Sequence, residues 1–244
     1  MVMRLHANFS APLLALAALA FCAGTRAQAQ STASPTAGNG TYIAGDPLAN
    51  VRYDDRFDAS LGAAYGHIHA GPDLDQGANL GGLDLTGSYW FSKHFALEGS
   101  GRVYVGTSGA AVNNDEPDGS NIKGPFVAEY LFAAGPEWLG PHNKHGALIA
   151  HALFGGAYGN FQKDLLGHDP STVGFYNNQI APAAIVGGHF DLNRSAQWVF
   201  RVTPDMLFTR YNANFATTTS SIGGHNNFNF ALSVGVEYKF KKKR

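Results

Sequence analysis

The sequence predicts an all-β protein, an eight-stranded antiparallel up-and-down transmembrane β-barrel. Three observations lead to this prediction. From about Phe57 onward, apolar and polar residues alternate in one segment after another, with almost no helical periodicity. The connections between these segments are alternately long and short, and aromatic residues collect on the apolar face near the short connections. A barrel that crosses a membrane combines these features, because its outer face contacts lipid and its aromatic rings lie at the lipid–water interface.

The N-terminal segment, residues 1–29, is predicted to be a cleavable signal peptide. It has a basic start at Arg4, an apolar run at 11–24 and the small residues "AQA" at 27–29. The apolar run is too short to cross a bilayer as a helix. The single cysteine, Cys22, lies in this segment, so the mature chain is expected to form no disulfide.

Three further parts of the chain are expected. Residues 30–55 are rich in Ser, Thr, Gly, Pro and Ala and are predicted to be a flexible N-terminal segment. Residues 56–240 hold all the alternating segments and are predicted to form one outer-membrane barrel domain. The closing "KKKR", residues 241–244, is predicted to be a basic tail in the periplasm.

Eight strands are expected, separated by turn signals. The short connections carry Asn, Gly, Pro or Ser, which favour tight turns, and the long connections are polar. The expected strands lie at 56–69, 80–91, 95–107, 124–138, 146–160, 179–190, 197–210 and 226–240.

The third, fourth and seventh strands each have one apolar and one polar face. The third turns Glu98 and Arg102 toward the interior, the fourth Glu129, and the seventh Arg201 and Asp205. Side chains about fill the interior of an eight-stranded barrel, and an isolated charge there would be costly. These five residues are therefore predicted to form a lumen charge cluster that pairs unlike charges and closes the lumen.

The fifth and sixth strands are rich in small residues on both faces. Their phase turns His151 and His189 inward. Pro182 and Pro204 interrupt the sixth and seventh strands, and proline cannot donate a hydrogen bond to a ladder. We expect these prolines to mark bulges or the extracellular rim.

Charge distinguishes the two ends of the predicted barrel. The long connections hold Asp73, Asp75, Asp115, Glu116, Asp118, Asp164 and Asp169 against Lys123 and Lys163. The short turns and the tail hold Lys93, Lys144, Arg194 and "KKKR" against Asp191. Barrels of this kind have long external loops and short periplasmic turns. We therefore expect the acidic end outside the cell and both termini in the periplasm.

Aromatic residues on the outward face near the short turns are expected to form a girdle at the lipid headgroups. They are Tyr89, Phe91, Phe95, Trp138, Phe190, Trp198 and Phe200, together with Tyr238 and Phe240 of the last strand.

The last strand, "FNFALSVGVEYKF", has alternate apolar positions that end in an aromatic residue. In this and in its architecture, the chain over residues 56–240 resembles the small eight-stranded outer-membrane barrels, a superfamily that includes the OmpA membrane domain and OmpX. The resemblance implies that the barrel assembly machinery recognises Val234, Val236, Tyr238 and Phe240. The chain departs from the family pattern because "KKKR" follows the terminal aromatic residue.

Several chemical functions find no support in the sequence. A net charge of −1 is not that of a nucleic-acid binder. The segments "HNN" and "HFD" lack the serine that an esterase would need, and nearby arginines explain Glu98 and Glu129 better than glycosidase chemistry does. His67 and His69 could hold zinc with acids of the following loop, but ten scattered histidines produce such pairs by accident. We expect no catalytic residue, metal or cofactor.

The sequence thus predicts an exported, monomeric barrel that contacts outer-membrane lipid and has a structural or adhesive surface role. Its extracellular ligand is not identified by the sequence. Two alternatives stay open: a narrow passive channel gated by the Arg102 and Arg201 carboxylate network, and a periplasmic lipocalin-like binding barrel. The second requires an apolar interior and a polar exterior, the reverse of the alternation described above. A lipid-modifying enzyme would need a nucleophile beside a histidine.

Overall fold

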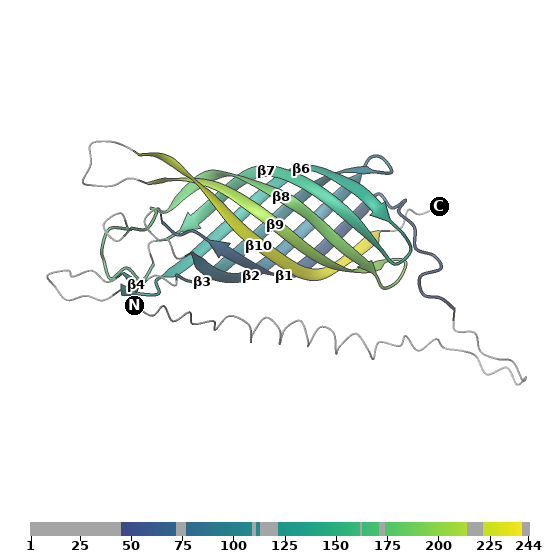
Figure 1. Cartoon of the computed structure of the whole chain (residues 1–244), viewed down its shortest axis with the longest axis horizontal. Coiled ribbons are helices and arrows are strands. Elements are labelled where there is room, and N and C mark those ends of the chain that lie inside the picture. Colours follow the sequence, from purple (N-terminus) through teal and green to yellow (C-terminus); the bar gives the residue numbers. More distant parts are fainter. Residues whose placement is uncertain are drawn as a thin grey trace, which may run out of the picture. The chain divides into compact units, whose positions relative to one another are not determined.

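The computed structural model describes residues 45–71, 77–108, 111–112, 122–161, 163–170, 174–213 and 222–240. Eight long strands form one closed antiparallel barrel, which confirms the predicted fold class (Figure 1). They are β1 (Phe57–Ile68), β2 (Ala78–Trp90), β3 (Phe95–Thr107), β6 (Phe126–His142), β7 (Gly146–Asn160), β8 (Gln179–Asn193), β9 (Trp198–Ala213) and β10 (Ile222–Phe240). A two-stranded sheet of β4 (Ala111–Val112) and β5 (Ile122–Lys123) lies between β3 and β6 in the chain.

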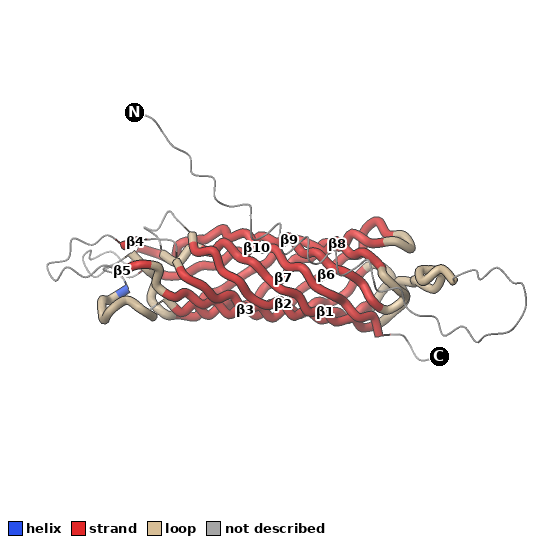
Figure 2. Tube along the Cα trace, turned by 90° about the horizontal axis from the view of Figure 1, so that it is seen from below, coloured by secondary structure: helices blue, strands red, loops and turns tan. Residues whose placement is uncertain are grey.

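Each barrel strand pairs with its neighbours in sequence, and the barrel closes where β10 pairs with β1. Phe57 lies opposite Phe240, and His67 lies opposite Phe230, so the closing ladder is long and regular. Figure 2 shows the strands running obliquely to the long axis. Without this pairing, β1 and β10 would be open edges. Closure gives their backbone N–H and C=O groups hydrogen-bond partners.

The barrel has two ends, which we name by their connections. The turn end is where β1 begins and β10 ends, and it holds the tight turns at 91–94, 143–145 and 194–197. The loop end is opposite, where β1 ends and the β4–β5 sheet lies (Figure 1). Among the described residues, no helix is long and apolar enough to span a membrane.

Four strands are longer than the alternation predicted. β6, β8 and β9 continue to His142, Asn193 and Ala213, and β10 begins at Ile222. The predicted strand ends were placed where the apolar residues of the outward face stop. In the structure, a strand continues as long as its backbone can pair with the neighbouring strand. Leu192, for example, still pairs with Gly146 beyond the predicted end of its strand.

The two faces of the barrel differ sharply in polarity. The outer face exposes large apolar side chains, among them Phe132 at 67%, Phe154 at 66% and Ile180 at 80%. The inner face buries charged ones, with Glu98 at 0% and Arg102 at 1% exposure. A water-soluble lipocalin-like barrel would show the opposite arrangement, so this sorting argues against that alternative.

Prolines lie inside the strands. Pro182 pairs in register with Gly156, without a bulge. At Pro204 the β8–β9 ladder skips two positions, and at Pro136 the β6–β7 ladder does the same. Because proline has no N–H group, it removes a ladder hydrogen bond without shifting the register. The expected bulges are therefore absent at Pro182 and Pro204. Pro182 does lie near the rim, close to the start of β8 at the loop end, whereas Pro204 lies inside β9.

Candidate functional site in the barrel lumen

The lumen contains far more acidic than basic side chains. Of the described residues, eight buried carboxylic acids accompany three buried arginines or lysines. The acids are Asp58, Asp84, Glu98, Glu129, Glu137, Asp191, Asp205 and Glu237, and the bases are Arg102, Arg201 and Lys239. The histidines His151 and His189 are buried among them. Such a lumen requires close pairing, because uncompensated charge is costly in a medium of low dielectric constant.

Arg102 of β3 connects two sides of the lumen. Its guanidinium lies 3.2 Å from Asp84 of the neighbouring β2 and 2.6 Å from Asp205 of β9 across the lumen. It also donates a hydrogen bond to the Ser100 hydroxyl at 3.1 Å. Ser233 of β10 donates to the other oxygen of Asp84 at 2.7 Å. The network around Arg102 and Asp84 therefore links four strands, β2, β3, β9 and β10.

Arg201 of β9 forms a second centre nearer the turn end. It makes a two-point contact with Asp191 of β8, with distances of 2.7 and 2.9 Å, and reaches Glu237 of β10 at 2.8 Å. Asp191 was expected in a short turn, but it lies in β8 with its side chain buried. The reason is that the β7–β8 ladder continues past it, through the pair Ala147–Asp191.

The described part of the predicted flexible segment covers the turn end. The Tyr53 hydroxyl donates to the Asn143 carbonyl at 3.0 Å and accepts from the Asn193 amide at 2.7 Å. The Lys239 ammonium lies 4.3 Å from the centre of the Tyr53 ring. Burial raises the pKa of Tyr53 above its usual value of 10.0. Tyr53 and its polar partners thus hold the end of this segment against the barrel.

Two of the cavities in the lumen are small. A cavity of about 20 Å³ at the turn end is lined by Tyr53, Trp90, Ile149, Asp191 and other residues. A second, of about 10 Å³, lies between Asp84 and Arg201. Each has room for about one water molecule. Toward the loop end an apolar cluster fills part of the interior, with Leu131, Leu153 and other buried side chains packed together.

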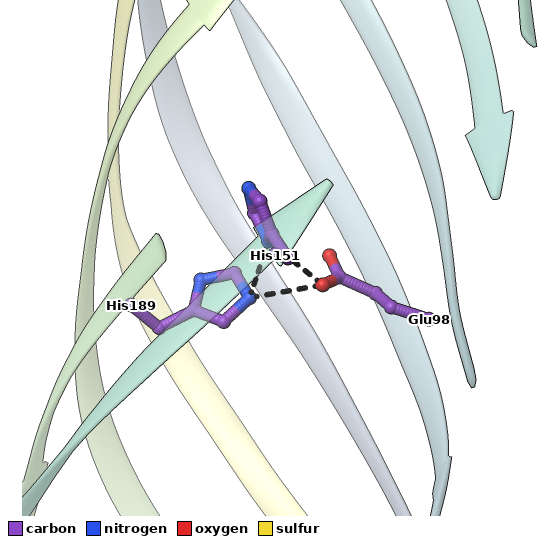
Figure 3. A group of neighbouring side chains, drawn as sticks. All are labelled: Glu98, His151 and His189. Carbon is purple, nitrogen blue, oxygen red and sulfur yellow. Dashed lines mark hydrogen bonds and ion pairs between the residues drawn. The ribbon is translucent and has the colours of Figure 1, made fainter. Parts of the chain in front are cut away.

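Between the two arginine centres lies a group of three ligating side chains, Glu98 of β3, His151 of β7 and His189 of β8 (Figure 3). Nδ1 of His151 is 2.8 Å from Oε2 of Glu98 and 3.2 Å from Nε2 of His189. Nε2 of His189 is 3.3 Å from the same Glu98 oxygen. All three residues are buried, and we call them the His–His–Glu cluster.

The five residues predicted as the lumen charge cluster all lie in the lumen, but they do not form one group. Arg102 and Asp205 are paired directly, and Arg201 has other partners. Glu98 contacts histidines instead of an arginine. Glu129 makes no ion pair with a described residue and lies beside Tyr211 nearer the loop end.

Other buried lumen residues were not predicted as part of the cluster. They are Asp58, Asp84, Glu137, His151, His189, Asp191, Glu237 and Lys239. The alternation of inward and outward residues along each strand could have identified them, and it did place the two histidines inward. What the phase does not reveal is which residues meet across the lumen. That depends on the stagger of eight strands around the closed barrel.

The seven predicted girdle residues lie on the outer face at the turn end. Exposure runs from 41% for Tyr89 to 65% for Phe91, and Phe200 is partly buried. Phe95 and Trp138 are direct cross-strand partners. On β10, Val234, Val236 and Phe240 are exposed and Tyr238 is partly buried, all on the outer face.

The histidine pair considered as a zinc site in the sequence, His67 and His69, lies at the loop end. Nδ1 of His67 is 2.9 Å from the Asn79 side-chain oxygen, and Nδ1 of His69 is 2.9 Å from that of Asn229. The two rings are 6.2 Å apart, and each histidine has its own amide partner. The acids expected beside them, Asp73 and Asp75, lie outside the described residues.

Comparison with known proteins gives a likeness in fold alone. No protein-family model and no curated protein matches the chain. The solved structure of the outer membrane protein OprG from Pseudomonas aeruginosa is 14% identical, covers 79% of this chain and 99% of its own, and has a TM-score of 0.50. Neisserial surface protein A is 14% identical, with 75% and 97% covered and a TM-score of 0.49. The attachment invasion locus protein Ail of Yersinia pestis is 15% identical, with 76% and 99% covered and a TM-score of 0.44. The chain therefore has the fold of the small eight-stranded outer-membrane barrels, in agreement with the resemblance found in its sequence.

Proposed function

We propose that this chain is an outer-membrane barrel of a diderm bacterium, with a closed lumen and a structural or adhesive role at the cell surface. The observation that carries the proposal is the pair of arginine centres: Arg102 bridges β3 to β9 across the lumen, and Arg201 joins β9 to its neighbours β8 and β10. No catalytic residue, cofactor or nucleic acid is part of it.

The outer face supports contact with membrane lipid. Large apolar side chains are exposed on every barrel strand, including Leu61, Leu83, Phe132 and Phe154. In water these groups would make one continuous apolar surface, whereas in a bilayer they contact hydrocarbon. A charge on this face at the midplane would cost about 2–4 kcal/mol for Arg or Lys. The fold shared with OprG, an outer membrane protein, supports the same location.

Export and assembly complete the proposal. Residues 1–29 act as a cleavable signal peptide. The barrel assembly machinery recognises the outward residues that end β10, with Phe240 as the terminal aromatic residue. The folded barrel is a monomer, because closure leaves no unpaired strand edge for a second chain. Its loop end faces outward, and any extracellular ligand binds there.

Electrical recording in planar bilayers tests the closed lumen. The wild-type barrel should give no steady conductance at neutral pH, because Arg102 and Arg201 hold the lumen shut with their carboxylate partners. The double variant Arg102→Ala/Arg201→Ala should give measurable openings, since it removes the bridge across the lumen and the ion pairs between β9 and its neighbours. Arg210→Ala, which alters an exposed side chain at the loop end, is the matched control and should behave as wild type.

Each protein is first shown to be folded by its heat-dependent gel migration. Steady wild-type openings at neutral pH would overturn the closed lumen and favour a narrow passive channel gated by the same charges.

A further inference from the structure

The His–His–Glu cluster brings three ligating atoms to one point. They come from β3, β7 and β8, so the cluster joins one side of the barrel to the other (Figure 3). The separations between Oε2 of Glu98, Nδ1 of His151 and Nε2 of His189 are 2.8, 3.2 and 3.3 Å. The three atoms therefore form a nearly equilateral triangle.

This triangle has the dimensions of one face of a zinc coordination tetrahedron. Ligand atoms about 2.0–2.1 Å from a tetrahedral zinc ion lie roughly 3.3–3.4 Å from one another. Two sides of the triangle already match, and the His151–Glu98 side needs to open by roughly half an ångström. The second oxygen of Glu98, Oε1, is buried and makes no hydrogen bond to a described residue, so it can complete the coordination.

The outer partners of both histidines orient the rings for metal binding. Nε2 of His151 lies 2.9 Å from Oδ1 of Asp205, and Nδ1 of His189 lies 2.8 Å from the hydroxyl of Thr203. Metal-ligating histidines usually hold their second nitrogen in this way, by a carboxylate or another oxygen. Each imidazole can thus donate outward and direct a lone pair into the cluster.

Hydrogen bonds can occupy only two of the three sides of the triangle at once. When Nδ1 of His151 and Nε2 of His189 both donate to the Glu98 oxygen, the two nitrogens, 3.2 Å apart, are not bonded to each other. A cation inside the triangle contacts all three atoms at once. The excess of carboxylates in the lumen favours such a cation, and Glu137 lies directly across the ladder from His151.

The nearby arginines do not fill this role. Arg102 is engaged with Asp84 and Asp205, and Arg201 with Asp191 and Glu237. We propose that Glu98, His151 and His189 bind a divalent first-row transition metal, with Zn²⁺ as the ion that the ligand set suits best. Two imidazoles and one carboxylate are ligands of zinc and its neighbours in the periodic table, whereas Ca²⁺ and Mg²⁺ prefer oxygen ligands.

The metal would link the two sides of the barrel and stabilise it. Because the cluster is buried, the ion enters while the barrel folds or from the turn end. On that side, the cavity lining includes Ile149 and Asp191, each two residues from a histidine of the cluster. The metal site does not depend on the proposed surface role, and the lumen can be closed with or without a bound metal.

The test is metal binding by the full barrel, prepared without a histidine tag and refolded in detergent after chelation. Titration with Zn²⁺ should show one tight site per chain, and saturation at 100 times the Kd should raise the Tm by at least about 5 °C. His189→Gln should abolish the tight site. Thr203→Val, which removes an outer partner, should weaken it about 10-fold or more.

The matched control is His67→Gln/His69→Gln, which removes the other histidine pair and should leave both stoichiometry and Tm shift unchanged. X-ray absorption of zinc in the wild-type barrel gives a result that does not depend on a variant folding. It should show nitrogen and oxygen ligands at about 2.0–2.1 Å, including two imidazoles. The absence of a stoichiometric site, a site unaffected by His189→Gln, or a shell without imidazole would overturn the proposal.

Discussion

Arg102 shows how one buried residue determines the state of the lumen. Its side chain is 1% exposed and contacts acids on two strands that are not neighbours. A buried ion pair of this kind is not by itself strongly stabilising, because both charges lose their hydration. Removal of one partner is the costly event, since it leaves the other charge buried without compensation.

Arg102→Met should therefore destabilise the barrel by about 3–5 kcal/mol, measured as the change in unfolding free energy by urea titration in detergent. Two carboxylates, Asp84 and Asp205, would lose their cation while methionine keeps most of the volume. Arg210→Met, at an exposed position of β9, is the control and should change the free energy by less than about 0.5 kcal/mol. Equal effects of the two substitutions would show that the Arg102 pairs contribute little.

At the scale of the element, β10 closes the barrel and carries the proposed assembly signal. It is the longest strand, with 19 residues, and it pairs with both β1 and β9. Its outward residues recur at every second position, which suits lipid contact and a recognition pattern equally well. The two roles can be separated, because lipid contact is shared along the strand whereas recognition depends on its end.

Phe240→Ala should lower the yield of folded barrel in cells several-fold, while refolding of the purified chain in detergent stays near the wild-type yield. The terminal aromatic residue would be needed for recognition and not for the fold. Phe228→Ala, an exposed aromatic residue near the other end of β10, is the matched control. If the two variants assemble equally well in cells, Phe240 is not a specific signal. The heat-dependent gel shift measures folded protein in both settings.

At the scale of the whole molecule, the barrel is asymmetric along its axis. The turn end has tight turns and a lumen mouth covered by Tyr53, whereas the loop end has an apolar cluster in its interior and the β4–β5 sheet. This asymmetry predicts the orientation in the membrane, with the turn end in the periplasm. The predicted mature chain lacks cysteine, so single cysteines can report that orientation.

Lys163→Cys at the loop end should react with a membrane-impermeant maleimide in intact cells. Lys144→Cys, whose position is in the turn between β6 and β7, should react only after the outer membrane is permeabilised. Lys144 is 55% exposed and Lys163 is also exposed, so a difference in labelling reports location and not burial. The opposite pattern would invert the proposed orientation, and labelling of both in intact cells would contradict membrane insertion.

The fold class, the number of barrel strands and the inward face of several strands could be predicted from the sequence alone. A strand turns alternate side chains to opposite faces, so a period of two in polarity is a local property that the chain displays directly. Glu98, Arg102, His151 and His189 could be assigned to the interior on this ground, and Phe95 and Trp138 to the exterior.

Which of these residues meet could be seen only in the folded barrel. Glu98 and His151 are on strands separated by β6, and Arg102 finds Asp205 on the far side of the lumen. These contacts depend on the stagger between strands and on closure of β10 against β1, both of which are non-local. The alternation of a single strand carries no information about them. For this reason, the sequence identified lumen charges, whereas the structure divided them into two arginine centres and a His–His–Glu cluster.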